Sequence, residues 1–260
     1  MGDYTYTTIT DRIARLTLNR PDSFNALDLP TARELADALL ELGADPAVQG
    51  VILTGAGRAF SAGGDIRRAA AYPNGPAAAF HELATYVHVC VTEIRRMPKP
   101  AIAAINGVAA GGGFSLALAC DFRVMAASAQ LRQGFTSNGL CIDAGGTFTL
   151  PRLVGLARAL EIAALDEPIS AERALAWGLV TRVADGAALL EEAQRLALAL
   201  AQRSLHSFGW SKRLLTDSFD ASWETQLDRE RQGLVSCVAH PDGQEGMRAF
   251  LEKRPPKYNR

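Results

Sequence analysis

Two short glycine-containing stretches decide the fold of this chain: Ala59–Ile66 reads AFSAGGDI, and Asn106–Gly113 reads NGVAAGGG. Each follows an apolar, strand-like run and contains glycine where a helix can begin. The first turn of a helix leaves its backbone N–H groups without internal partners. If the two stretches converge, two such groups can bind one carbonyl oxygen and form an oxyanion hole. Taken alone, a glycine triplet is explained more simply by a tight turn with close helix–strand packing.

Strand-like and helix-like segments alternate around these stretches. Four short apolar runs are expected to be strands: Ile13–Leu18, Val51–Thr54, Ala101–Ile105 and Asp121–Met125. One helical pattern begins after Asp28, and another runs from about Ala77 to Arg96, where Pro98 stops it. Continuous apolar runs are typical of strands buried on both faces of a parallel sheet. The alternation predicts an α/β fold with right-handed crossovers.

The character of the sequence changes near Ala187. From there on, Ala, Leu, Glu and Arg dominate, no strand pattern is visible, and three to four helices are expected. We therefore divide the chain into an α/β core over residues 1–186 and a helical region over residues 187–260. Helices that cannot bury their apolar faces within one chain favour packing against neighbouring copies.

Composition restricts the function classes. The chain has 260 residues, of which 48% are hydrophobic and 21% charged, and its net charge is −1. This balance fits a globular protein without the basic field that attracts nucleic acid. The four cysteines are dispersed and form no CxxC pair, so neither a disulfide framework nor a zinc site is expected. No signal peptide or membrane span is recognisable, and we expect a cytoplasmic protein without nucleic-acid or membrane partners.

The sequence resembles the crotonase (enoyl-CoA hydratase/isomerase) superfamily over nearly its whole length. Besides the two glycine-containing stretches, the matching segments are LNRP at Leu18–Pro21, NAL at Asn25–Leu27, KPA at Lys99–Ala101, ACDFR at Ala119–Arg123, GGT at Gly145–Thr147, PRLVG at Pro151–Gly155 and ALAWGLV at Ala174–Val180. The resemblance implies a spiral of ββα units with a helical C-terminal trimerisation region, assembled as a trimer or a dimer of trimers. It also implies an acyl-CoA thioester as the substrate, with no metal and no permanently bound cofactor.

The resemblance assigns binding roles to several residues. The thioester oxygen would lie between the backbone N–H groups of Gly64 and Gly112, which match the family's oxyanion positions. Four residues are expected to contact coenzyme A, largely through the backbone: Phe24, Ala62, Asp65 and Ile66. Phe250 and Lys253 match positions that reach the adenine and phosphate end, commonly from a neighbouring subunit. A cation that compensates a helix C-terminus is the other explanation for Lys253.

Hydration is not the expected reaction. Hydratases of the family hold and activate water with two glutamates. In this chain the corresponding positions are Ser115 and Phe135. Neither side chain can act as a carboxylate, so syn hydration by that route is not expected.

Asp143, in the stretch GLCIDAGG at Gly139–Gly146, offers one carboxylate instead. An aspartate at this position resembles members that move double bonds, including ring-opening isomerases of the phenylacetate pathway and dienoyl-CoA isomerases. One carboxylate suits a 1,3-proton shift, because it can take a proton from one carbon and return it two carbons away. The resemblance therefore favours an enoyl-CoA isomerase. The structural alternative is that Asp143 caps the helix expected near Gly145.

His88 supports a second interpretation. Counted back from Pro100, it falls where aromatic-CoA dehalogenases of the superfamily carry their water-activating histidine, and Asp143 then matches their nucleophile. The tryptophan of their pocket, near Phe135, is missing here. A structural or solvated histidine is the simpler explanation for a single His on a mixed helix face. The remaining interpretations are a hydratase-like member in which other residues supply the acids, and a catalytically inactive member that binds coenzyme A or RNA. All of these remain open at this point.

Overall fold

The computed structural model describes residues 2–259, whose strands form two sheets. The six-stranded sheet has the order β1-β2-β3-β5-β7-β10, and the four-stranded sheet has the order β4-β6-β8-β9. The strands of the first sheet are β1 Thr5–Thr10, β2 Ile13–Leu18, β3 Gly50–Gly55, β5 Ala101–Ile105, β7 Phe122–Ala126 and β10 Arg182–Ala184. Those of the second are β4 Ala59–Ser61, β6 Val108–Ala110, β8 Gln130–Arg132 and β9 Ile169–Ser170.

From β3 to β8, consecutive strands enter the two sheets alternately. The strands β3, β5 and β7 run parallel in the larger sheet, and β4, β6 and β8, which follow them in the chain, run parallel in the smaller one. Helices follow each strand pair: α2 Ile66–Ala70 and α3 Gly75–Arg96, then α4 Gly112–Ala119, then α5 Gly146–Val154 and α6 Leu156–Leu165. The predicted α/β class and the spiral of ββα units are confirmed.

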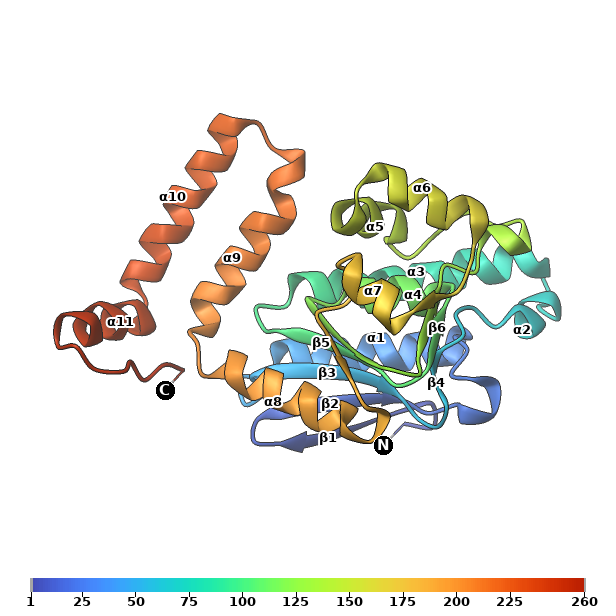
Figure 1. The fold of residues 1–260 in the computed structure, drawn as a ribbon, viewed down its shortest axis with the longest axis horizontal. Coiled ribbons are helices and arrows are strands. Elements are labelled where there is room, and N and C mark those ends of the chain that lie inside the picture. The colour runs from blue at the N-terminus through green and yellow to red at the C-terminus, as the bar shows by residue number, and fades with distance from the viewer. Residues whose placement is uncertain (1, 260) are drawn as a thin grey trace.

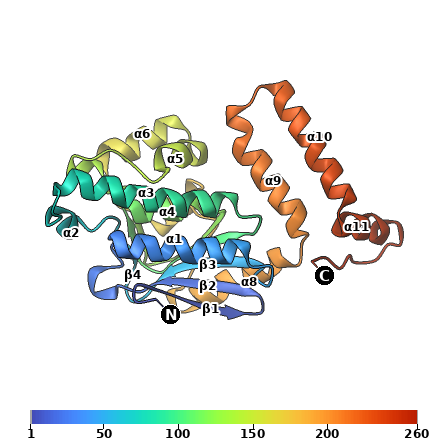
Figure 2. The ribbon, with the colours of Figure 1, turned by 180° about the vertical axis from the view of Figure 1, so that it is seen from behind.

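Helices cover both faces of the larger sheet (Figures 1 and 2). On one face lie α1 Leu29–Ala44 and α3, and on the other lies α8 Leu189–Ala201. Helix α1 begins as predicted, because the Asp28 carboxylate accepts a hydrogen bond from the Thr31 N–H at 3.0 Å and Pro30 occupies the first turn. Three short 3-10 turns, at Pro21–Ser23, Thr136–Asn138 and Gly186–Ala188, and the helix α7 Ala171–Ala176 complete the core and its connections. A fourth, at Ser218–Asp220, lies in the C-terminal region.

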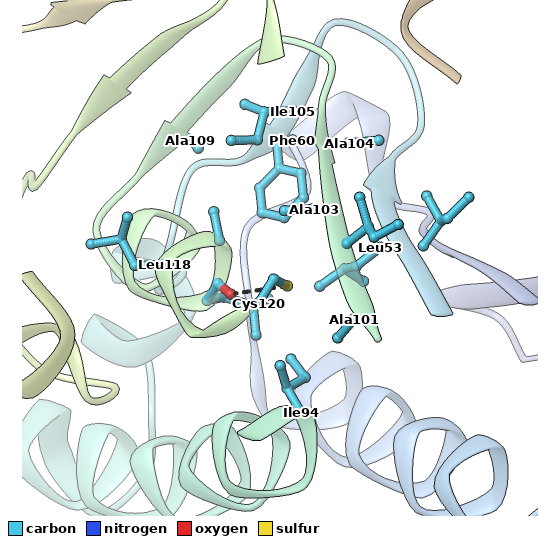
Figure 3. Close-up of a cluster of buried hydrophobic side chains, with 14 of the residues drawn as sticks. Leu53, Phe60, Ile94, Ala101, Ala103, Ala104, Ile105, Ala109, Leu118 and Cys120 are labelled. Carbon is cyan, nitrogen blue, oxygen red and sulfur yellow. Dashed lines mark hydrogen bonds between the residues drawn. The ribbon is translucent and has the colours of Figure 1, made fainter. Parts of the chain in front are cut away.

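Strand β5 lies between β3 and β7 in the larger sheet, at the centre of a cluster of buried hydrophobic side chains (Figure 3). All five side chains of β5 are buried, and small alanines on this strand leave room for the fully buried ring of Phe60. Burying each large apolar side chain contributes about 1.5–3 kcal/mol. Burial also raises the pKa of the Cys90 and Cys120 thiols to about 12, so both are unreactive thiols of the interior.

The C-terminal region is helical, but its first helix belongs to the core. Helix α8 buries Leu189, Ala193 and Ala197 against the larger sheet. Beyond it, α9 Leu205–Asp217, α10 Trp223–Ala239 and α11 Pro241–Leu251 stand to one side of the sheets (Figure 1). Among residues 2–259, no helix combines the length and the hydrophobicity needed to cross a bilayer.

A buried ion pair attaches α9 to the core. The Lys212 ammonium donates to the Asp121 carboxylate at 2.8 Å and to the Ile94 carbonyl at 2.7 Å. Asp121 also accepts from the Ala101 N–H at 2.8 Å, so one carboxylate joins α9 to the start of β5. Only 5% of the Lys212 side chain and 15% of the Asp121 side chain are exposed. Two charges withdrawn from water in this way are stable only while they remain paired.

Candidate active site

The two predicted oxyanion donors lie side by side. A Cβ built on Gly112 would come within 3.8 Å of the Gly64 nitrogen. Among residues 2–259, neither of these two N–H groups has a hydrogen-bond acceptor. Gly63 and Gly113 are buried, whereas Gly64 and Gly112 are partly exposed. The two unpartnered donors are therefore the ones that a ligand can reach.

Backbone contact between the two stretches explains why both are rich in glycine. Gly63 has a φ of 85°, and a Cβ there would lie 2.7 Å from both the Ala110 carbonyl oxygen and the Gly112 nitrogen. A Cβ on Gly113 would lie 2.3 Å from the Ser61 carbonyl oxygen. Contacts under 3.0 Å between a Cβ and backbone cannot be relieved by moving a side chain. Glycine at these positions is what allows the two donors to meet.

His88 and Asp143 form a hydrogen-bonded pair. The His88 Nε2 lies 2.8 Å from the Asp143 Oδ1, and 52% and 44% of the two side chains are exposed. Helix α5 has Gly145 as its N-cap and no side-chain cap, so the explanation of Asp143 as a helix cap is wrong. The Gly146 N–H donates to the Asp143 backbone carbonyl at 3.1 Å, and the Asp143 side chain is bonded to His88.

Helix α3 connects the donors to this pair. A Cβ at Gly64 would touch Phe80 Cε1 at 3.0 Å and Leu83 Cδ2 at 3.6 Å. His88 follows Leu83 by five residues on the same helix, which corresponds to about 7.5 Å along its axis. Helix α3 therefore contacts the Gly64 loop through Leu83 and carries His88 about 1.4 turns further along, on a different face of the helix.

Helix α4 connects the second donor, Gly112, to the turn that carries Asp143. Ser115 lies one turn after Gly112, and a Cβ at Gly146 would come within 2.6 Å of the Ser115 Oγ. Gly146 is bonded to the Asp143 carbonyl, so the turn that carries Asp143 packs against the helix that begins at the second donor. Helices α3 and α4, which pack against each other, thus link the segments that carry His88 and Asp143 to the two stretches that carry the free N–H groups. This arrangement can stabilise an oxyanion and transfer a proton a few bonds away from it.

Comparisons with known proteins identify the family of this chain. A family profile described as "Enoyl-CoA hydratase/isomerase" matches residues 8–260. The "1,2-epoxyphenylacetyl-CoA isomerase" of Escherichia coli K12 is 36% identical over 259 residues, which covers 99% of each chain. This chain belongs to the enoyl-CoA hydratase/isomerase family. It is therefore an acyl-CoA-processing enzyme of the crotonase superfamily, whose members use coenzyme A thioesters.

Two further similarities show how diverse the family is. A "4-chlorobenzoyl coenzyme A dehalogenase-2" of an Arthrobacter species is 34% identical, covering 94% of this chain and 89% of its own. A crystal structure described as an enoyl-CoA hydratase from Polaromonas sp. JS666 has a TM-score of 0.92 at 36% identity, covering 98% of this chain and 99% of that one. Membership of the enoyl-CoA hydratase/isomerase family therefore leaves the reaction to be decided by the residues around the donors.

The predicted coenzyme A contacts of this family member divide into two groups. Phe24, Ala62, Asp65 and Ile66 lie together next to Gly64, since the Ala62 N–H donates to the Phe24 carbonyl at 2.9 Å and the Asp65 N–H donates to the Leu27 carbonyl at 2.8 Å. Phe250 and Lys253 lie in and after α11, at the opposite end of the molecule from α2 (Figures 1 and 2). A single chain does not bring the two groups together.

An ion-pair cluster, which the sequence did not predict, shapes the first group. The Arg20 guanidinium lies 3.0 Å from Asp65 and 3.4 Å from Asp28, and the Asp65 carboxylate also caps α2 by accepting from the Arg68 N–H at 3.1 Å. Burial alone would raise the pKa of Asp65, but the hydrogen bonds from Arg68 and Arg20 outweigh it and hold that pKa below its ordinary value. Asp65 thus stays ionised and fixes the loop after Gly64.

The two hydratase positions contain no acid in this family member. Ser115 is 0% exposed, and its Oγ has no hydrogen-bond partner among residues 2–259. Because Gly146 packs directly on this hydroxyl, a glutamate at residue 115 would not fit without moving α5. Phe135, at the other position, is a partly buried apolar ring. The part of the chain that the structure describes also contains no cluster of three or more His, Cys, Asp or Glu residues able to hold a metal ion.

A cavity of about 740 Å³ lies next to His88 and was not foreseen from the sequence. Helices α3, α5 and α9 line it, together with the 3-10 turn that follows α9. Within it, the Phe148 ring packs against the guanidinium of Arg95 at 4.4 Å and that of Arg152 at 3.4 Å. The helices that line this cavity are far apart in the sequence, so no local sequence pattern predicts it.

Proposed function

We propose that this protein is an enoyl-CoA isomerase that moves a double bond by a 1,3-proton shift. The observation that carries the proposal is a single carboxylate, Asp143, bonded to His88 at 2.8 Å, in a chain that also presents the two unpartnered donors Gly64 and Gly112. The missing acids at residues 115 and 135 argue against hydration. The similarity to a protein named 1,2-epoxyphenylacetyl-CoA isomerase favours isomerisation among the family's reactions.

The proposed reaction needs no group beyond these residues and the thioester. With a 3-enoyl thioester, the Asp143 carboxylate takes a proton from C2, and the electron pair of that C–H bond moves onto the thioester oxygen. The N–H groups of Gly64 and Gly112 stabilise the resulting dienolate. The Asp143 carboxylic acid then delivers a proton to C4, which leaves a 2-enoyl thioester.

The direct test is to offer 3-enoyl-CoA esters of several chain lengths to the wild-type protein. We expect conversion to the conjugated 2-enoyl esters without addition of water. Ultraviolet absorbance detects the conjugated product, and mass spectrometry shows whether water has been added. A product that is mainly 3-hydroxyacyl-CoA would contradict the proposal. Binding of the esters without any turnover would instead identify the protein as an inactive binding member.

A second candidate function has its own support. The His88–Asp143 contact and the 34% identity to a protein named as a dehalogenase suit an enzyme in which Asp143 attacks an aromatic acyl-CoA ring and displaces a leaving group. Water activated by His88 would then hydrolyse the aryl ester at the Asp143 carboxyl carbon. A single turnover in ¹⁸O-labelled water separates the two functions, because this route places label in the Asp143 carboxylate and the isomerase route does not.

Removing one oxyanion donor is expected to slow turnover by about 10²–10³-fold. Gly112→Pro deletes the N–H at the first position of α4, where proline is favoured. The φ of Gly112 is not positive, and a Cβ there makes only ordinary contacts. The kcat of the variant and its thermal unfolding should be measured together. Unchanged kcat in a folded variant would show that this N–H does not bind the thioester oxygen.

We infer that the protein is a homo-oligomer, either a trimer or a dimer of trimers, with coenzyme A bound between copies. Large apolar side chains on α10 and α11 are exposed, including Trp223 at 73%, Leu234 at 66% and Phe250 at 82%. Exposure on this scale favours burial against another copy. It would also bring Phe250 and Lys253 of one copy to the loop around Ile66 of the next. Sedimentation should give three or six times the chain mass, and a stable monomer at micromolar concentration would contradict this.

A further inference from the structure

We propose that His88 is a positioning residue for Asp143 that also connects this carboxylate to water, so that the migrating proton exchanges with solvent before it is returned. The inference rests on the proposed isomerase function and concerns the path of the proton. It assigns to His88 a role in isomerisation, separate from activation of a water nucleophile.

The contacts of the pair suit both parts of this role. His88 Nε2 is bonded to Asp143 Oδ1, whereas Asp143 Oδ2 has no hydrogen-bond partner within residues 2–259. A carboxylate held through one oxygen keeps its other oxygen free to meet the substrate, and its rotation is restricted. The other ring nitrogen of His88, Nδ1, also has no partner in the described part of the chain. With 52% of its side chain exposed, the imidazole can exchange its N–H protons with water.

The proton path balances without any further reactant. The C2–H bond of the substrate breaks, its electron pair enters the dienolate, and the proton forms an O–H bond on Asp143. In the tautomer of His88 that carries its hydrogen on Nδ1, Nε2 accepts this proton from the acid, which gives a carboxylate and an imidazolium whose Nδ1–H is open to water. The imidazolium exchanges with water and returns a proton through the same contact, and that proton forms the new bond at C4. Because 44% of the Asp143 side chain is itself exposed, this route requires the bound ester to cover the free Asp143 oxygen. A covered carboxylic acid without His88 would return the original proton.

The test is isomerisation of a 3-enoyl-CoA in D₂O, with the deuterium at C4 of the product measured by mass spectrometry at low conversion. Wild type is expected to incorporate deuterium in most turnovers. In His88→Phe, the exchanged fraction should fall severalfold, and kcat should fall about tenfold because the carboxylate is no longer oriented. His88→Asn keeps a hydrogen-bond donor but cannot carry a proton, so it should recover much of kcat while exchange stays low.

The chain provides a matched control in His81→Phe. His81 lies two turns before His88 on α3 and is exposed, and its side chain makes no contact with Asp143. This variant should leave kcat and deuterium incorporation unchanged. If active His88 variants incorporate as much deuterium at C4 as the wild type, the inference is overturned and the isomerase function is left intact. Wild type that does not isomerise any 3-enoyl-CoA would overturn both.

Discussion

Asp143→Asn is expected to lower the rate of 3-enoyl-CoA isomerisation by up to about 10⁴-fold. The amide has nearly the same shape as the carboxylate and can still accept a hydrogen bond from His88, but it cannot take a proton from carbon. The oxyanion donors and the coenzyme A contacts are left in place, so affinity for the ester should change little. Steady-state kcat measures the first effect, and calorimetric titration with a 2-enoyl-CoA measures the second.

Asp185→Asn is the control for this prediction. Asp185 is exposed, and its side chain caps no helix, so this variant should keep wild-type activity. If Asp143→Asn loses less than about tenfold, another group must move the proton. Loss of both binding and activity would indicate that Asp143 holds the loop in place, and thermal unfolding of the variant would then fall as well.

The parts of the fold that local chemistry controls could be predicted from the sequence. Asp28 caps α1 as expected, and the continuous apolar run Ala101–Ile105 is a strand buried on both faces. Strand β1 was missed because its sequence TYTTIT buries only its first residue and lies at the edge of the sheet. The strands of the smaller sheet are two or three residues long, which is too short for a period-2 pattern to be recognised.

The part of the candidate site that could be predicted is the part where the backbone geometry requires glycine. Gly63 and Gly113 are required because two backbones touch, and that requirement is visible as glycine. The contact between His88 and Asp143 spans 55 positions, and no spacing rule relates them. Only the resemblance to known dehalogenases placed them in one site. Whether Asp143 caps a helix depends on the residue at which α5 begins, and a sequence pattern locates a helix end only to within a few residues.

Lys212→Met is expected to destabilise the protein by about 3–5 kcal/mol. Methionine can fill the space of the lysine stem, but the Asp121 carboxylate then loses its partner while it remains buried. The carbonyl of Ile94 also loses its donor. Urea denaturation of both proteins measures the difference. Arg213→Met is the matched control on the same helix, because Arg213 is exposed and only stacks on Trp210, and its loss should cost about 1 kcal/mol or less.

The pH dependence of Lys212→Met identifies the cause of its instability. Burial raises the pKa of Asp121 above its ordinary 3.8, although Lys212 opposes the shift, so removing Lys212 raises that pKa further. An acid with a higher pKa in the folded state binds more protons folded than unfolded, and stability then falls as pH rises through that interval. The free energy of unfolding of Lys212→Met should therefore fall further below that of the wild type as the pH rises from about 4 towards 7. Adding Asp121→Asn should remove this pH dependence, because it leaves no buried charge. A deficit that stays constant over this range would mean that lost packing, and not an unpaired carboxylate, destabilises the variant.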